Sequence, residues 1–86
     1  MPTTWKKRIT NEMKAFGEEW GDIVSTTMSV KQANAKFDDG FGGVNGIEFT
    51  VWTSSRVYFP ACCNGSEWVE SVSRNPDSKP TEHIGG

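Results

Sequence analysis

The fold is decided by residues 47–74, IEFTVWTSSRVYFPACCNGSEWVESVSR, in which apolar and polar side chains alternate around two turn signals. Asn64-Gly65 is the stronger signal, because both residue types tolerate the positive φ angles that a two-residue hairpin loop requires. This loop predicts that Cys63 faces Ser66 and sets the register of the hairpin. The stretch therefore predicts three antiparallel strands joined by two hairpins.

The two hairpins must agree about which face of the sheet is buried. A two-residue loop at Ser54-Ser55 would place Trp52 opposite Val57. It would also turn Phe49 away from the core, because a shift of one residue moves every side chain of a strand to the other face. We therefore expect an odd loop there. The expected buried face consists of Ile47, Phe49, Val51, Val57, Phe59, Ala61, Trp68 and Val72.

The residues ahead of this stretch predict two helices. The first follows a cap at Thr3 or Thr4 and either continues to Val24 or ends earlier at a glycine. Its apolar stripe, with spacings of three and four residues, is typical of a helix packed on a core. The stripe consists of Trp5, Ile9, Met13, Phe16 and Trp20. The second is expected from about Val30 to Phe37, after a capping box at Ser29 and Gln32.

Together these elements predict one α+β domain at residues 1–74. Its two N-terminal helices pack on one face of a three-stranded antiparallel β-meander. Residues 75–86 are rich in proline and polar side chains and are expected to form a C-terminal tail. The 86-residue chain contains four Trp and five Phe, which supply enough apolar area for a core despite the small size.

No pair of residues shows the spacing of a catalytic acid and base or of a nucleophile and base, so we expect no enzyme. Cys62 and Cys63 are adjacent and are expected to be reduced thiols, and with the distant His83 they do not make a zinc site. The glycine-rich stretch 39–46 lacks the pattern of a phosphate or calcium loop. We expect no cofactor and no metal. With no apolar run after the basic N-terminus and none long enough to span a bilayer, a cytoplasmic protein is expected.

The charges are unevenly distributed, although the net charge is only −2. Residues 1–16 carry Lys6, Lys7, Arg8 and Lys14 against a single acid, Glu12. This basic end could be an ordinary solvated face, or it could bind an acidic or phosphate-bearing surface. A nucleic-acid-binding or regulatory protein is therefore one alternative, although the net acidity counts against it.

Two short helices cover only one side of a three-stranded sheet, so the other side is expected to be open. Trp and Tyr are frequent interface hot spots, so we expect Trp52, Tyr58 and Val69 to contact a partner, with Glu48 and Glu67 at the rim. The alternative is that the tail folds back over this side. Lys6, Lys7 and Arg8 complete the candidate binding residues.

The segment FTVWTSSRVYFPACCNGSEWVESVSRNP, residues 49–76, together with the ending HIGG, resembles the C-terminal part of small proteins encoded in phages and prophages. Some proteins of that kind are inhibitors of host defence, including anti-CRISPR proteins. The resemblance implies a stoichiometric binder that blocks a larger host protein or ribonucleoprotein complex, and it carries over no catalytic residue. The terminal Gly85-Gly86 also resembles ubiquitin-like and sulfur-carrier proteins, but those folds begin with a β-hairpin, whereas a helix is expected first here.

Overall fold

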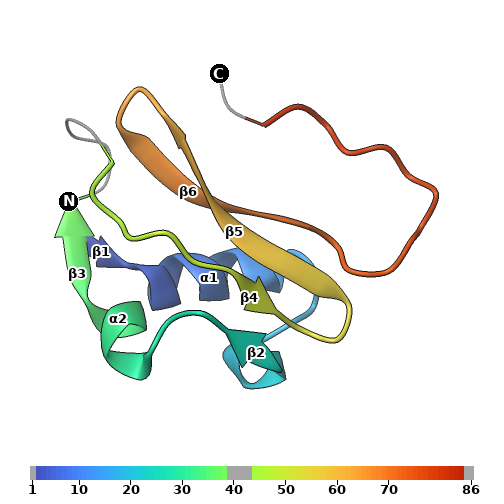
Figure 1. Ribbon diagram of the computed structural model, residues 1–86, viewed down its shortest axis with the longest axis horizontal. Coiled ribbons are helices and arrows are strands. Elements are labelled where there is room, and N and C mark those ends of the chain that lie inside the picture. Colours follow the sequence, from blue (N-terminus) through green and yellow to red (C-terminus); the bar gives the residue numbers. More distant parts are fainter. Residues whose placement is uncertain (1, 39–43, 85–86) are drawn as a thin grey trace.

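The computed structural model describes residues 2–38 and 44–84 as a small α+β fold (Figure 1). Among them are two α-helices and two antiparallel sheets, one of two strands and one of four. The helices are α1 (Trp5–Lys14) and α2 (Val30–Asn34), with a short 3-10 turn, η1 (Trp20–Asp22), after α1. The strands are β1 (Pro2–Thr4), β2 (Ser25–Thr26), β3 (Lys36–Asp38), β4 (Val51–Trp52), β5 (Arg56–Cys63) and β6 (Ser66–Ser73).

The expected three-stranded meander beneath two N-terminal helices is wrong. The larger sheet has the order β2-β4-β5-β6, so the short strand β2, from the link between the helices, adds a fourth strand beside β4. The smaller sheet joins β1 to β3, with Thr3 opposite Phe37. The chain therefore begins with a strand that leads directly into α1, and residues 36–38 are extended where the end of the second helix was expected.

The Asn64-Gly65 hairpin is confirmed. Asn64 and Gly65 have φ angles of 52° and 84°, as a type I′ turn requires, and Cys63 pairs with Ser66. The same register continues along both strands to Arg56 opposite Ser73. Pro60 lies in β5 beyond the short pairing with β4, so its missing N–H leaves no gap in that ladder.

The expected odd loop between β4 and β5 is wrong. Trp52 pairs with Val57, which leaves the two-residue turn Ser54-Ser55. Thr53 explains this turn: its Oγ1 accepts hydrogen bonds from the backbone N–H groups of Ser55 (3.3 Å) and Arg56 (2.9 Å). A threonine side chain that bonds to the following backbone in this way stabilises a tight turn.

On β5 and β6, the face that packs on the core is consequently the opposite of the one expected, whereas Phe49 and Val51 are buried as expected. Tyr58 is fully buried and Val69 is 4% exposed, beside Val51 on the same side of the sheet. The α1 side chains Trp5, Ile9 and Met13 are buried against this face as the helical stripe predicts. The core is completed by Met28, Ala33 and Phe49. Of the expected face, Val57, Phe59, Ala61, Trp68 and Val72 are half-buried, and Ile47 is exposed.

The helices are shorter than expected. α1 starts after the Thr4 cap, whose side chain accepts the N–H of Lys7, and it ends at Lys14. Gly17, at φ 69°, follows in a left-handed conformation that favours glycine. Phe16 therefore leaves the stripe and is 43% exposed, so its expected core position is wrong. The capping box of Ser29 and Gln32 at the start of α2 is confirmed.

Trp5 fixes the segment that leads into β4. Its ring contacts Phe37 and Phe49, with centroid distances of 4.7 and 4.9 Å, and its Nε1 donates to the carbonyl of Ile47 at 3.0 Å. Gly46 lies so close to this ring that an added Cβ would be 2.5 Å from it. Residues 39–43, which include most of the glycine-rich stretch, lie outside the described residues, as do Gly85 and Gly86.

The C-terminal segment leaves β6 and forms a wide arc beside the larger sheet (Figure 1). Residues 75–84 contain no helix or strand, and their side chains are exposed. In the described part of the chain, neither helix has the length and apolar character needed to cross a membrane.

Candidate functional site

The expected open surface on the side of Tyr58 does not exist, because that side carries the core. Tyr58 and Val69 are buried under α1 and are not available to a partner in this structure. The tyrosine hydroxyl is tolerated there because it donates a 2.6 Å hydrogen bond to Oε1 of Glu18. Trp52 and Tyr58 moreover lie on opposite faces, since Trp52 pairs with Val57, the neighbour of Tyr58 in β5.

Glu67 is not a rim residue. It is 3% exposed, and its carboxylate accepts hydrogen bonds from the backbone N–H groups of Asn45 (2.9 Å) and Gly46 (2.8 Å). These bonds satisfy the buried charge and attach the segment before β4 to the start of β6. Glu67 is therefore a structural residue that joins two segments distant in sequence.

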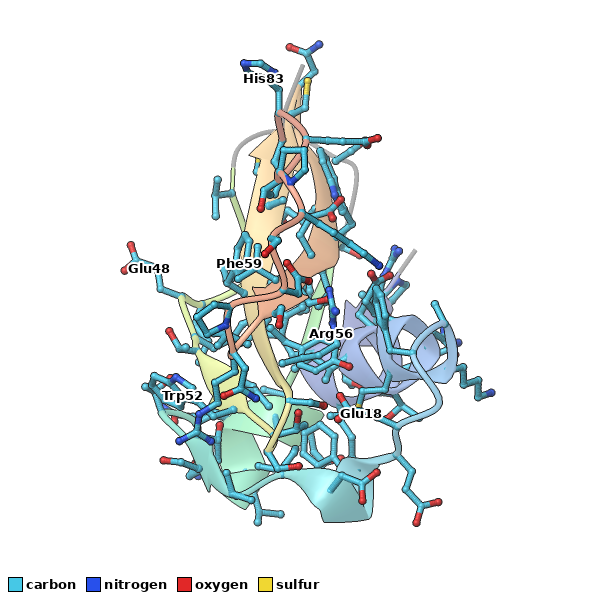
Figure 2. The ribbon with its side chains drawn as sticks, turned by 90° about the vertical axis from the view of Figure 1, so that its right-hand side faces the viewer. Glu18, Glu48, Trp52, Arg56, Phe59 and His83 are labelled. Carbon is cyan, nitrogen blue, oxygen red and sulfur yellow. The ribbon has the colours of Figure 1, made fainter. Side chains whose placement is uncertain are left out.

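Glu48 and Trp52 lie on the side of the molecule away from Glu18 (Figure 2). Glu48 is exposed and Trp52 is half-buried. Phe59 lies toward this side as well, whereas Arg56 is directed toward α1. Two of the five expected residues of the open surface are therefore accessible, and they lie next to the side chains that were expected in the core.

These side chains form what we call the outer face of the sheet. They project from β4, β5 and β6 on the side opposite Tyr58, and none belongs to the core cluster. Trp68 adds a hydrogen bond from its Nε1 to Oε2 of Glu70 at 2.7 Å, which holds the indole at the surface. All members are half-buried. The outer face consists of Trp52, Val57, Phe59, Ala61, Trp68 and Val72.

The basic residues of α1 form a second surface. Lys6 and Lys7 are exposed, and Arg8 is half-buried. Lys6 Nζ lies 5.6 Å from the centre of the Trp20 ring, a cation–π distance. Lys14 is also exposed, whereas Glu12, the only acid of the helix, is half-buried and lies near Glu70 of β6. The exposed charges of α1 are therefore mainly positive.

Glu18 and Arg56 organise the end of the sheet near the last turn of α1. Besides Tyr58, Glu18 accepts a hydrogen bond from Ser55 Oγ at 2.9 Å. Burial alone would raise the pKa of Glu18, but hydrogen bonds from Tyr58, Thr53 and Ser55 and the charge of Arg56 lower the pKa overall. Burial and the neighbouring Glu18 raise the pKa of the Tyr58 hydroxyl, so it is protonated at neutral pH.

A cleft of about 670 Å³ lies between this end of the sheet and the C-terminal segment. One wall is formed by Phe16, Arg56 and residues 71–74, and the other by residues 75–81. Arg56 stacks on the Phe16 ring, with its guanidinium carbon 3.6 Å from the ring centre. Its Nε and Nη2 donate to Ser71 Oγ (2.9 Å) and Ser71 O (3.2 Å). These contacts fix the guanidinium plane at the cleft.

Sequence reasoning missed Glu18 and Arg56. Their partners are distant along the chain, and Glu18 is 37 residues from Ser55 and 40 from Tyr58. Such pairings leave no local signal. The one available clue was Tyr58 itself, because a buried tyrosine hydroxyl requires a partner.

Metal-ligating and nucleophilic side chains are dispersed in the described residues. No group of three His, Cys, Asp or Glu side chains there could hold a metal ion. Cys62 is exposed and Cys63 half-buried, and both are free thiols. His83 is exposed in the C-terminal segment, at the far end of the view in Figure 2 from Glu18.

Comparison of the chain with protein-family models, curated proteins and solved structures found no match. The geometry described above is therefore the basis for a functional proposal, together with the resemblance of residues 49–76.

Proposed function

We propose that this chain is a small non-catalytic protein that binds a larger host complex by protein–protein contact and inhibits it. The outer face of the sheet carries the proposal. It places two tryptophans and a phenylalanine on one side of β4, β5 and β6, outside the core cluster. Aromatic side chains gathered on a surface of this kind are typical anchors of protein interfaces.

The charges around the outer face indicate what partner it fits. Glu48 is exposed beside it, and Glu70 lies on it opposite Phe59. Outside residues 1–16 the chain has ten acids and five bases, given its totals of eleven and nine. A partner surface with an apolar centre and a basic rim is complementary to this arrangement.

The narrower form of the proposal is an inhibitor encoded by a phage or mobile element, directed against a host-defence assembly of the CRISPR type. The resemblance of residues 49–76 and the ending HIGG supports it. Such an inhibitor acts in the host cytoplasm and needs neither a cofactor nor a metal. It works by occupying a surface of the host complex.

The experiment compares Phe59→Lys with Val30→Lys in cells whose CRISPR assembly targets an infecting phage. Both variants add a lysine, but Val30 is 80% exposed on α2, away from the outer face. We expect plaque formation with the wild type and with Val30→Lys, and its loss with Phe59→Lys. Thermal melts of both purified variants should show a folded protein.

Loss of a central aromatic anchor is expected to weaken binding by about 2 kcal/mol or more, which is roughly thirtyfold in affinity. Full inhibition by a folded Phe59→Lys variant would exclude the outer face as the interface. A wild-type chain that leaves every tested CRISPR assembly active would remove the narrower form of the proposal.

A second candidate function is nucleic-acid binding through α1. The observation that favours it is the exposure of Lys6, Lys7 and Lys14, while Glu12 is half-buried. A fluorescent DNA duplex tests it by anisotropy: binding should weaken as salt rises and be lost when Lys6 and Lys7 are changed to Glu. Absence of binding at low salt would rule out this candidate.

A further inference from the structure

The cleft between the end of β6 and the C-terminal segment is a candidate site in its own right. Its volume of about 670 Å³ lies in the range of roughly 300–1,000 Å³ that is usual for ligand sites. Its walls carry three cationic side chains, Arg56, Arg74 and Lys79, against one carboxylate, Asp77. Arg56 also interacts electrostatically with Glu12 and Glu18, but neither carboxylate lines the cleft.

The two arginines are held in place before any ligand binds. Phe16 and Ser71 fix the Arg56 guanidinium, as described above. Arg74 donates its backbone N–H to Ser55 O at 2.8 Å and its Nη1 to Thr53 O at 2.9 Å. Contacts with described residues thus use two of the five N–H donors of Arg56 and one of those of Arg74. The remaining donors can bind an anion.

The wall formed by residues 75–81 is an irregular segment with a tight bend of its own. Ser78 adopts a positive φ of 62°, and Asp77 Oδ1 accepts the N–H of Lys79 at 3.0 Å. This tight bend turns the chain at the position where Lys79 reaches the cleft. Within the described residues, the segment is tied to the sheet through Asn75, whose Nδ2 lies 3.5 Å from Ser54 O. Beyond Asn75, the side chains of this segment are exposed.

We infer that this cleft binds carboxylate groups of an acidic segment of the partner protein. Planar guanidinium groups bind carboxylates through paired, directional hydrogen bonds. Val72 belongs both to the outer face and to the cleft, so one partner can cover the outer face and place an acidic segment here. The inference rests on the proposed protein–protein function and specifies one of its contacts, between carboxylates of the partner and the cationic side chains of the cleft.

Titration of the full-length ¹⁵N-labelled chain with a capped hexaglutamate peptide tests this inference without any partner. We expect amide shifts concentrated in residues 71–81, weaker binding at higher salt, and a decrease in affinity of about tenfold or more in Lys79→Gln. Lys36→Gln makes the same charge change on β3, which lies far from the C-terminal segment in Figure 1, and should bind as the wild type does. Lys79 is exposed, so its variant keeps the fold.

Three results would overturn the inference. Shifts confined to residues 5–14 would assign anion binding to α1. Tighter binding of an oligothymidylate than of the peptide, with the same amides shifting, would assign the cleft to phosphate. The third is an absence of shifts at millimolar peptide. If binding to the cleft fails while Phe59→Lys still abolishes inhibition, the proposed function stands without this contact.

Discussion

The buried hydroxyl of Tyr58 donates a 2.6 Å hydrogen bond to the carboxylate of Glu18. This bond joins β5, an inner strand of the larger sheet, to the segment between α1 and η1. This bond makes it possible for Tyr58 to lie in the core, because a buried hydroxyl without a partner destabilises a fold. It is also one of the contacts on which the covered face of the sheet depends. The outer face is left for other contacts.

The first prediction concerns this pair. Tyr58→Phe removes this bond and should lower the free energy of unfolding by about 1.5–3 kcal/mol, the range for a hydrogen bond to a charged group, whereas Glu18→Gln keeps an acceptor oxygen and should cost less. The double variant should lose less than the sum of the two, because Tyr58→Phe removes the bond that Glu18→Gln weakens by taking away its charge. Urea melts of the four proteins measure the coupling. Additive losses would mean that the charge of Glu18 does not strengthen its hydrogen bond with Tyr58.

The second prediction concerns pH. The folded-state pKa of Glu18 lies below its ordinary value of 4.5, so its contribution to stability is present above that value and lost as the pH falls through the folded-state pKa. We therefore expect the cost of Glu18→Gln to be larger at pH 7 than at pH 3. Urea melts at both pH values are the measurement. An equal cost at the two pH values would show that the charge of the Glu18 carboxylate does not stabilise the fold.

Glu12 should show the opposite pH dependence. Burial, then the charge of Glu70, raise its pKa above 4.5, although Arg56 lowers it. A raised acid pKa favours the folded state at low pH, and this benefit is lost as the pH rises through the folded-state pKa. Glu12→Gln should therefore stabilise the protein at pH 7 relative to the wild type and make little difference at pH 3. Destabilisation at pH 7 would contradict the direction of the shift.

A third prediction concerns close packing at Gly46. The Cβ of Gly46→Ala would be 2.5 Å from the Trp5 ring, which is 1% exposed and cannot move aside. We expect a loss of about 1–3 kcal/mol, the usual cost of overpacking. Gly21→Ala is the matched control, because its Cβ would meet no atom nearer than 4.0 Å. A Gly46 variant as stable as the control would mean that this segment does not pack on Trp5.

Phe16 provides a fourth prediction. Its position in the expected stripe would make Phe16→Ala cost about 3–5 kcal/mol, the range for a buried aromatic residue. Because Phe16 is 43% exposed and stacks on Arg56, we expect instead a loss of about 0.5–1 kcal/mol. Met13→Ala, at a fully buried position of α1, should cost about 2–5 kcal/mol. Urea melts measure the stability loss of each variant. Similar losses for Phe16→Ala and Met13→Ala would mean that Phe16 is a core residue.

Local signals predicted much of the fold. The hairpin at Asn64-Gly65, the cap at Thr4 and the capping box of Ser29 and Gln32 all depend on residues within four positions of one another. The pairing of β2 with β4 and of β1 with β3 was missed, because strands of two or three residues carry no periodic pattern.

The buried face could not be predicted, because both faces of β5 and β6 are apolar enough to form a core. The choice depends on contacts across the chain. Tyr58 requires Glu18, Glu67 requires the N–H groups of Asn45 and Gly46, and Thr53 closes the short turn. Without these partners, hydrophobicity alone favoured Phe59 and Trp68 over Tyr58 and Glu67. For the same reason, the candidate binding surface lies on the side of the sheet opposite Tyr58, where the core had been expected.

The last prediction separates Trp52 from Tyr58, which the sequence placed together in one binding patch. Trp52 is half-buried on the outer face, whereas Tyr58 is fully buried under α1. Trp52→Ala should weaken inhibition of the host complex, by about 2 kcal/mol in binding, with little change in the melting midpoint. Tyr58→Ala should lower the midpoint strongly, because it leaves a cavity and removes one of the hydrogen bonds that Glu18 accepts.

Binding measured on the folded fraction of each variant decides between these roles. Tyr58→Ala molecules that remain folded should bind nearly as the wild type does, since the partner does not reach this side chain. Ser54→Ala, at an exposed position of the turn between β4 and β5, is the control for a neighbouring change that alters neither property. If Trp52→Ala lowers the melting midpoint and leaves binding intact, Trp52 supports the fold and the partner contacts another surface.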